Sequence, residues 1–89
     1  MPRYFFHLRN FLDVPDPEGE EFANFELAQA AAVKYARDMV AVSAQEHGAI
    51  DLTHYIEVIG EKGESMLTVE FGQAVRVSEG NREISPGWK

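Results

Sequence analysis

Cysteine is absent from this chain of 89 residues. Its absence excludes structural disulfides, thiolate catalysis and cysteine-ligated zinc, and it is typical of a protein that folds in the cytosol. Long apolar runs are also absent: no stretch approaches the roughly 20 residues that a membrane span requires, and residues 1–10 hold no signal-peptide core. We therefore expect a cytoplasmic protein with no membrane partner.

Basic residues are scarce, with 8 Lys and Arg against 15 Asp and Glu, which gives a formal net charge of −7. Such a charge repels a phosphate backbone unless the basic residues gather on one face. They are instead spread along the chain from Arg3 to Lys89. Nucleic-acid binding is therefore not expected, and the acidic balance is most simply a solubility feature.

The composition is that of a small globular domain, with 45% hydrophobic and 11% aromatic residues. A chain of this length can build one hydrophobic core without help from metals or disulfides. We expect a single domain over residues 1–77. Residues 78–89 are rich in turn formers and are predicted to be a loosely ordered tail, from which Ile84 and Trp88 could dock on the domain.

The segment from Asn24 to Gly48 predicts the one long helix of the chain. Asn24 is a favourable N-cap, and Gly48 suits the left-handed position that closes a helix. The alanines would let the helix approach a sheet closely. The residues that share one broad apolar arc are Phe25, Ala28, Ala31, Ala32, Val33, Tyr35, Ala36, Met39, Val40 and Val42.

The segments before the helix predict an N-terminal hairpin. Residues 3–9 alternate like a half-buried strand, and residues 11–14 can turn back on it. Residues 15–19 read as a rigid turn in which Gly19 takes a positive φ, and residues 20–22 add a short extended piece. The residues on the core face of the first strand are Tyr4, Phe6 and Leu8.

The segments after the helix predict a second hairpin, from Tyr55–Ile59 and Ser65–Phe71, with a polar turn at residues 61–64 that contains Gly63. Residues 72–77 would form one helical turn or a short extension. The pairs expected to face the helix are Ile56 and Val58 with Leu67 and Val69. The fold class is therefore α+β: a mostly antiparallel sheet of about four strands packed on one central helix.

One helix can cover only one face of such a sheet. Apolar side chains on the other face are either scattered exposed residues or a patch that a partner covers. We favour self-association, because symmetric dimers are the commonest oligomers. The candidate interaction face consists of Phe5, His7, Tyr55, Ile59 and Met66.

Three separated motifs resemble a known family. PRYFFHLR opens the chain, PDPEGEE precedes the Ala-rich helix, and IEVIGEKGESMLTVEF follows it. In this order and spacing they are similar to a small domain-of-unknown-function family of rhizobia and related alphaproteobacteria, over residues 1–77. The resemblance implies the same strand, acidic turn, helix and hairpin order, and it brings no activity and no catalytic residues.

No motif in the sequence specifies chemistry. An EF-hand loop with Gly19 at its sixth position would need carboxylates where Val14 and Phe25 stand. The three histidines share no ligand spacing; they are His7, His47 and His54. We therefore expect no metal, no cofactor and no catalytic residue.

The expected function is a non-enzymatic protein-interaction or regulatory module, homodimeric or bound to another protein. One alternative is an antitoxin-like regulator, because strands, an acidic turn and an Ala-rich helix in this order look like the domains of HicB-type antitoxins. Another is a small enzyme or ligand-binding protein that uses His7, Arg9 and Tyr55 around a cleft at the sheet edge.

Overall fold

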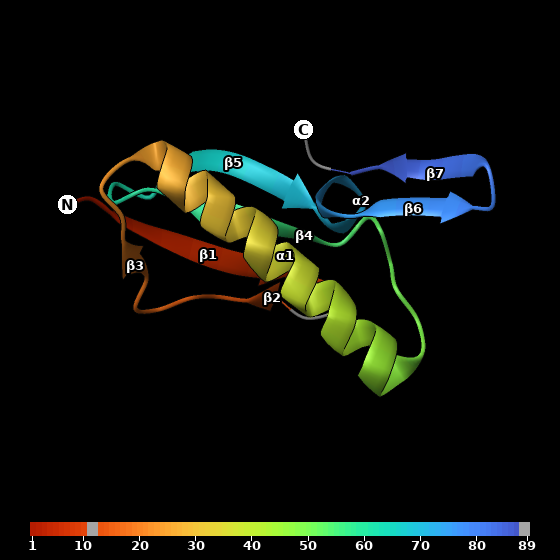
Figure 1. The fold of residues 1–89 in the computed structure, drawn as a ribbon. Coiled ribbons are helices and arrows are strands. Elements are labelled where there is room, and N and C mark those ends of the chain that lie inside the picture. The colour runs from red at the N-terminus through yellow and green to blue at the C-terminus, as the bar shows by residue number, and fades with distance from the viewer. Residues whose placement is uncertain (11–12, 88–89) are drawn as a thin grey trace.

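The computed structural model describes residues 1–10 and 13–87, and Figure 1 shows one long helix lying across one face of an antiparallel sheet. The predicted α+β class is confirmed. The larger sheet has five strands, because two short strands both pair with the first one. The elements are β1 Arg3–Arg9, β2 Asp13–Val14, β3 Glu20–Glu21, α1 Phe25–His47, β4 Tyr55–Ile59, β5 Ser65–Glu70, α2 Phe71–Ala74, β6 Arg76–Glu79 and β7 Arg82–Pro86.

The sheet has the order β2-β1-β4-β5, and β3 pairs with β1 as well. β2 lies along Leu8 and Arg9 at one end of β1, and β3 lies along Arg3 and Tyr4 at the other end. The two short strands therefore share one edge of β1. Of the predicted second strand, Asp13–Val14 is confirmed, and Phe11 and Leu12 lie outside the described residues.

Helix α1 begins and ends as predicted. The Asn24 side chain accepts a hydrogen bond from the Leu27 amide at 3.0 Å, and Gly48 closes the helix with φ of 62°. Ala28, Ala32 and Ala36 are fully buried against the sheet. The arc was predicted to extend to Val42, but Val42 is 40% exposed because the last turns of the helix run past the sheet edge (Figure 1). Within the described residues, no helix is long and apolar enough to cross a membrane.

The core lies between α1 and the sheet. Ile56 pairs with Val69 and Val58 with Leu67, as the alternation predicted. Phe71, the first residue of α2, fills the end of the core and is 1% exposed. The buried hydrophobic residues are Tyr4, Ala28, Ala32, Val33, Ala36, Ile56, Val58, Val69, Phe71 and Ala74.

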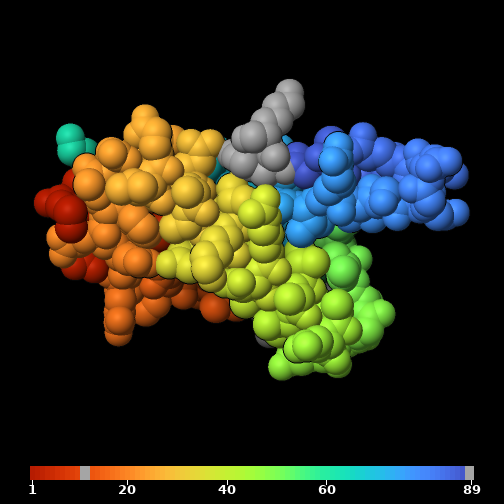
Figure 2. Space-filling model, in the orientation of Figure 1, coloured from red at the N-terminus to blue at the C-terminus, as the bar shows by residue number. Residues whose placement is uncertain are grey.

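The C-terminal residues form a further hairpin where a loose tail was predicted. β6 and β7 pair from Arg76 and Pro86 to Glu79 and Arg82, so the expected boundary at residue 77 falls inside this hairpin. The hairpin projects from the body (Figure 2). Its buried contact is Ser85, whose hydroxyl oxygen is hydrogen-bonded to the carbonyls of Gly72 and Val75. Ile84 is 53% exposed, and Trp88 lies outside the described residues.

Residues 15–19 connect β2 to β3, and we call them the acidic loop. Two glycines with positive φ, one inside this loop and one outside it, test how tightly the loop packs on β1. Gly19 has φ of 68°, and a Cβ there would lie 2.8 Å from the Phe5 ring and from the Tyr4 carbonyl oxygen. Gly63 has φ of 81° and no neighbour within 4 Å of such a Cβ. At both positions a side chain would strain the backbone, because φ is positive. Only at Gly19 would the added Cβ also clash with neighbouring atoms.

We predict that Gly63→Ala lowers the free energy of unfolding by about 1 kcal/mol, which is the left-handed backbone cost alone. Gly19→Ala should lower it by about 2–4 kcal/mol, because overpacking adds to that cost. Urea denaturation of the two variants measures the difference. Equal losses in both variants would mean that the loop does not pack against Phe5 as described.

Candidate functional site

The sheet face turned away from α1 is the first candidate site, and we call it the uncovered face. Its side chains alternate with the core residues along β1 and β4, and each is partly exposed. Cross-strand partners on this face are Phe5 with Ile59, His7 with Glu57, and Arg9 with Tyr55. The one long helix among the described residues lies on the opposite face (Figure 1).

The apolar end of the uncovered face is formed by Phe5 and Ile59. Met66 lies at the same end of the sheet and is 40% exposed. A register shift pairs Ile59 with Ser65 and Val58 with Leu67, so a β-bulge leaves Met66 without a cross-strand partner. Alternation in the sequence could not place this bulge.

Among the candidate interaction residues, Phe5 and Ile59 therefore lie at one end of the uncovered face and Tyr55 lies at the other. The structure places Phe5 opposite Ile59. Met66 directly follows Ser65, which is the partner of Ile59 on β5. Tyr55 lies at the other end of β4, opposite Arg9. His7 lies between these ends, opposite Glu57, so a polar middle separates Tyr55 from the apolar pair.

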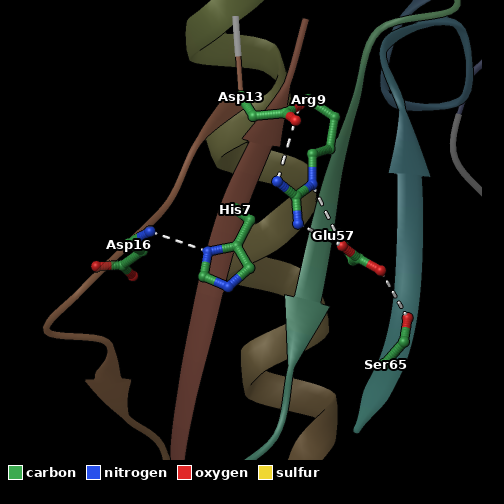
Figure 3. Close-up of polar contacts among 6 residues, drawn as sticks. All are labelled: His7, Arg9, Asp13, Asp16, Glu57 and Ser65. Atoms are coloured by element: carbon green, nitrogen blue, oxygen red, sulfur yellow. Dashed lines mark hydrogen bonds and ion pairs between the residues drawn. The ribbon is translucent and has the colours of Figure 1, made fainter. Parts of the chain in front are cut away.

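The polar middle of the uncovered face contains a linked ion pair (Figure 3). Arg9 donates from Nε and Nη2 to Oε1 of Glu57 at 3.3 and 3.1 Å. The other Glu57 oxygen accepts from the Ser65 hydroxyl at 3.1 Å. About a quarter of each charged side chain is exposed, 28% for Arg9 and 24% for Glu57, so water screens this pair only in part.

His7 joins the uncovered face to the acidic loop. Its Nδ1 accepts a hydrogen bond from the Asp16 amide at 2.9 Å (Figure 3). An accepting Nδ1 carries no proton, so the neutral ring bears its hydrogen on Nε2. The ring is thereby fixed in orientation, and one of its two nitrogens is committed to the fold.

Asp16 has a structural role that the sequence did not reveal. It lies in the segment predicted to be a rigid turn, and its Oδ1 accepts from the amides of Glu18 and Gly19, at 3.3 and 3.1 Å. Its Oδ2 also accepts from the Phe6 amide at 3.2 Å. Phe6 lies in β1 between the stretches paired with β2 and β3, so Asp16 satisfies the strand edge where neither short strand reaches. The tendency of Asp to bind local amides was the available signal.

A cleft on the helix side of the sheet edge is the second candidate site, and we call it the edge cleft. Its volume is about 490 Å³. It lies between α1, β1 and the loop that connects β2 to β3. The lining residues are Phe6, Leu8, Val14, Pro15, Asp16, Pro17, Gly19, Glu20, Tyr35, Asp38, Met39 and Ile56. His7, Arg9 and Tyr55, around which a ligand site was hypothesised, do not line this cleft.

Tyr35 and Glu20 form the polar contact of the edge cleft. The Tyr35 hydroxyl donates to Oε1 of Glu20 at 2.5 Å. This hydrogen bond, followed by burial and by the charges of Glu20, Asp16 and Asp38, raises the pKa of Tyr35 to about 12. The phenol therefore stays protonated to a higher pH than an ordinary tyrosine, in a region of negative potential.

The residues of the edge cleft were not singled out in the sequence. They come from three segments, at residues 6–8, 14–20 and 35–39, with Ile56 from a fourth. Each segment by itself reads as a strand, a turn or a helix. Only the packing of α1 against the edge of β1 brings their side chains together.

A second cavity of about 560 Å³ lies near the C-terminal end of α1, lined in part by His47, Asp51 and His54. His54 Nε2 is 3.4 Å from Oδ2 of Asp51. Hydrogen bonds from the Thr53 hydroxyl and amide, aided by His54, lower the pKa of Asp51. Over residues 1–10 and 13–87, no group of three or more His, Cys, Asp and Glu is placed to hold a metal ion.

Comparison with known proteins gives a family and no activity. The family model described as "Domain of unknown function (DUF6894)" matches residues 3–72. The matched range runs from β1 into α2, so hairpin β6–β7 lies outside it. No curated protein and no solved structure matches the chain. The likeness to HicB-type antitoxins therefore stays a prediction.

The pKa of Tyr35 predicts a pH dependence. Because this pKa rises from 10.0 to about 12 on folding, the contribution of Tyr35 to stability is complete below pH 10.0 and is lost as the pH rises toward about 12. The difference in tyrosinate absorbance between the wild type and Tyr35→Phe should titrate near pH 12. Glu20→Gln should move this midpoint to lower pH, and Glu21→Gln should leave it in place. A wild-type midpoint near 10, with the fold intact by circular dichroism, would contradict the Tyr35–Glu20 contact.

Proposed function

Because the chain belongs to the DUF6894 family, a family of unknown function, we propose a function from its architecture: it is a non-enzymatic interaction module that self-associates through the uncovered face. The observation that carries the proposal is that, within residues 1–10 and 13–87, α1 is the one layer that covers the sheet. α1 buries the residues of β1, β4 and β5 that point toward it, while Phe5 and Ile59 on the other side remain partly exposed.

The composition of the uncovered face supports docking of another protein surface. An apolar pair, Phe5 and Ile59, stands beside a polar group in which Arg9 pairs with Glu57 at 3.1 Å and with Asp13 at 3.8 Å. Protein interfaces commonly combine an apolar centre with a satisfied polar rim. A rotationally symmetric contact centred on this apolar pair would place the pairs of two copies against each other, which buries both at once.

The polar groups of this face support recognition over catalysis. Arg9 and Glu57 are engaged with each other, and Nδ1 of His7 accepts a backbone hydrogen bond. A general base needs an accepting atom directed at a substrate proton. These groups instead hold β1, β4, β5 and the acidic loop in place, so they shape a fixed surface for a partner.

A charge placed in the apolar pair tests the proposal. We predict that the wild type is dimeric in sedimentation velocity at tens of micromolar and that Ile59→Lys raises the dissociation constant at least about tenfold, because two ammonium groups would face each other across the symmetric contact. The matched control is Val42→Lys, which puts the same charge on a 40% exposed β-branched position of α1. It should dimerise like the wild type.

Circular dichroism of each variant establishes that it is folded before the masses are compared. A wild type that sediments as a strict monomer at this concentration contradicts self-association. A folded Ile59→Lys variant that dimerises as strongly as the wild type places the contact elsewhere and contradicts the assignment to the uncovered face. Loss of dimer in both Lys variants would also contradict that assignment.

A further inference from the structure

The edge cleft has the size and the floor of a small-molecule site. Its volume of about 490 Å³ falls within the range of roughly 300–1,000 Å³ that is usual for ligand pockets. The floor is apolar and includes Leu8, Met39 and Ile56. Phe6 and Tyr35 meet edge to face there, with ring centroids 5.2 Å apart, so the wall is aromatic and fixed by packing.

The polar groups around this apolar floor have one sign of charge. Asp16 comes from the acidic loop, Glu20 from β3 and Asp38 from α1, and among the described lining residues none is Lys or Arg. The raised pKa of Tyr35 has the charges of these same three carboxylates among its causes. The cleft therefore combines an apolar interior with negative potential at its rim.

The three carboxylates are committed to the fold to different degrees. Asp16 accepts backbone hydrogen bonds, and Asp38 is paired with Lys34 at 3.0 Å, in an exposed pair of the kind that contributes little to stability. Glu20 accepts the Tyr35 hydroxyl with Oε1. Glu20 is exposed and sits at the rim, so its charge is the one best placed to meet a ligand.

We propose that the edge cleft binds a small organic cation, an ammonium compound with a hydrocarbon body. The body would lie against Phe6 and Met39, where it replaces water on apolar surface. The ammonium group would face Glu20 and the ring of Tyr35, which attracts a cation through its π face. A carboxylate or phosphate ligand of the same size would be repelled by the rim.

This inference is independent of self-association. The edge cleft opens on the side of the sheet that carries α1, whereas the uncovered face lies on the other side. Binding of a cation would leave the oligomeric state unconstrained, and a monomeric protein could still bind it. The two experiments can therefore fail separately.

Amide chemical shifts of the ¹⁵N-labelled full chain, titrated with three probes of matched shape, test the proposal. The probes are 2-phenylethylammonium, 2-phenylethanol and phenylacetate. We expect the ammonium compound to shift amides of the cleft, including those of Glu20 and Met39, and to bind at least about fivefold more tightly than the alcohol. Phenylacetate should bind more weakly than either.

Glu20→Gln removes the rim charge while keeping an oxygen for the Tyr35 hydroxyl, and it should weaken binding of 2-phenylethylammonium about three- to tenfold. Glu21→Gln is the matched control. It removes the same charge from the same strand, and Glu21 pairs with Arg3 at 2.9 Å without lining the cleft. Its affinity for 2-phenylethylammonium should equal that of the wild type.

Three results would overturn the proposal. One is a titration in which millimolar 2-phenylethylammonium shifts no amide of the cleft. Another is equal binding of all three probes, which would mean an apolar cleft without charge selection. The third is an equal loss of affinity in Glu20→Gln and Glu21→Gln, because a general acidic field would then explain the attraction. Well-dispersed spectra of both variants show that they are folded.

Discussion

The close contact between the alanines of α1 and the sheet is the constraint on which the rest of this structure depends. Ala28, Ala32 and Ala36 have no exposed surface, and their small side chains let the helix backbone lie close to β4 and β5. One helix therefore closes the core of a small chain. Because α1 is the only long helix among the described residues and lies on this face, no helix of the described residues covers the other face of the sheet.

The acidic loop lies between the two candidate sites and contributes to both. Its Asp16 satisfies the edge of β1, donates its amide to His7 on the uncovered face, and lines the edge cleft. Gly19 allows the close approach, because its missing side chain leaves room for the Phe5 ring. The loop thus acts as a structural element of the sheet edge.

The local features of this fold could be predicted from the sequence. The caps at Asn24 and Gly48 depend on neighbouring backbone, and the pairing of Ile56 with Val69 follows from alternation and turn length. Hairpin β6–β7 was missed because its residues have turn-forming composition, and its buried contact is a polar one, made by Ser85 with the carbonyls of Gly72 and Val75 in and just after α2.

The candidate sites were predicted only in part. Which face of the sheet is uncovered followed from the alternation of Phe5 and Ile59 with core residues. The bulge at Met66 and the position of Tyr55 at the far end of β4 from Ile59 could not be predicted in this way, because both depend on the detailed strand register. The edge cleft was invisible in the sequence, because Phe6, Glu20 and Tyr35 become neighbours only when α1 packs against β1.

We propose that a second copy of the chain covers the sheet face that α1 leaves open. Isotope-filtered NOE spectroscopy on a mixture of labelled and unlabelled chains tests it most directly, because only contacts between chains give signals. We expect intermolecular NOEs between the Phe5 ring and the Ile59 methyl groups. Intermolecular NOEs confined to α1 or to hairpin β6–β7, or none at a concentration where the wild type is dimeric, would contradict it.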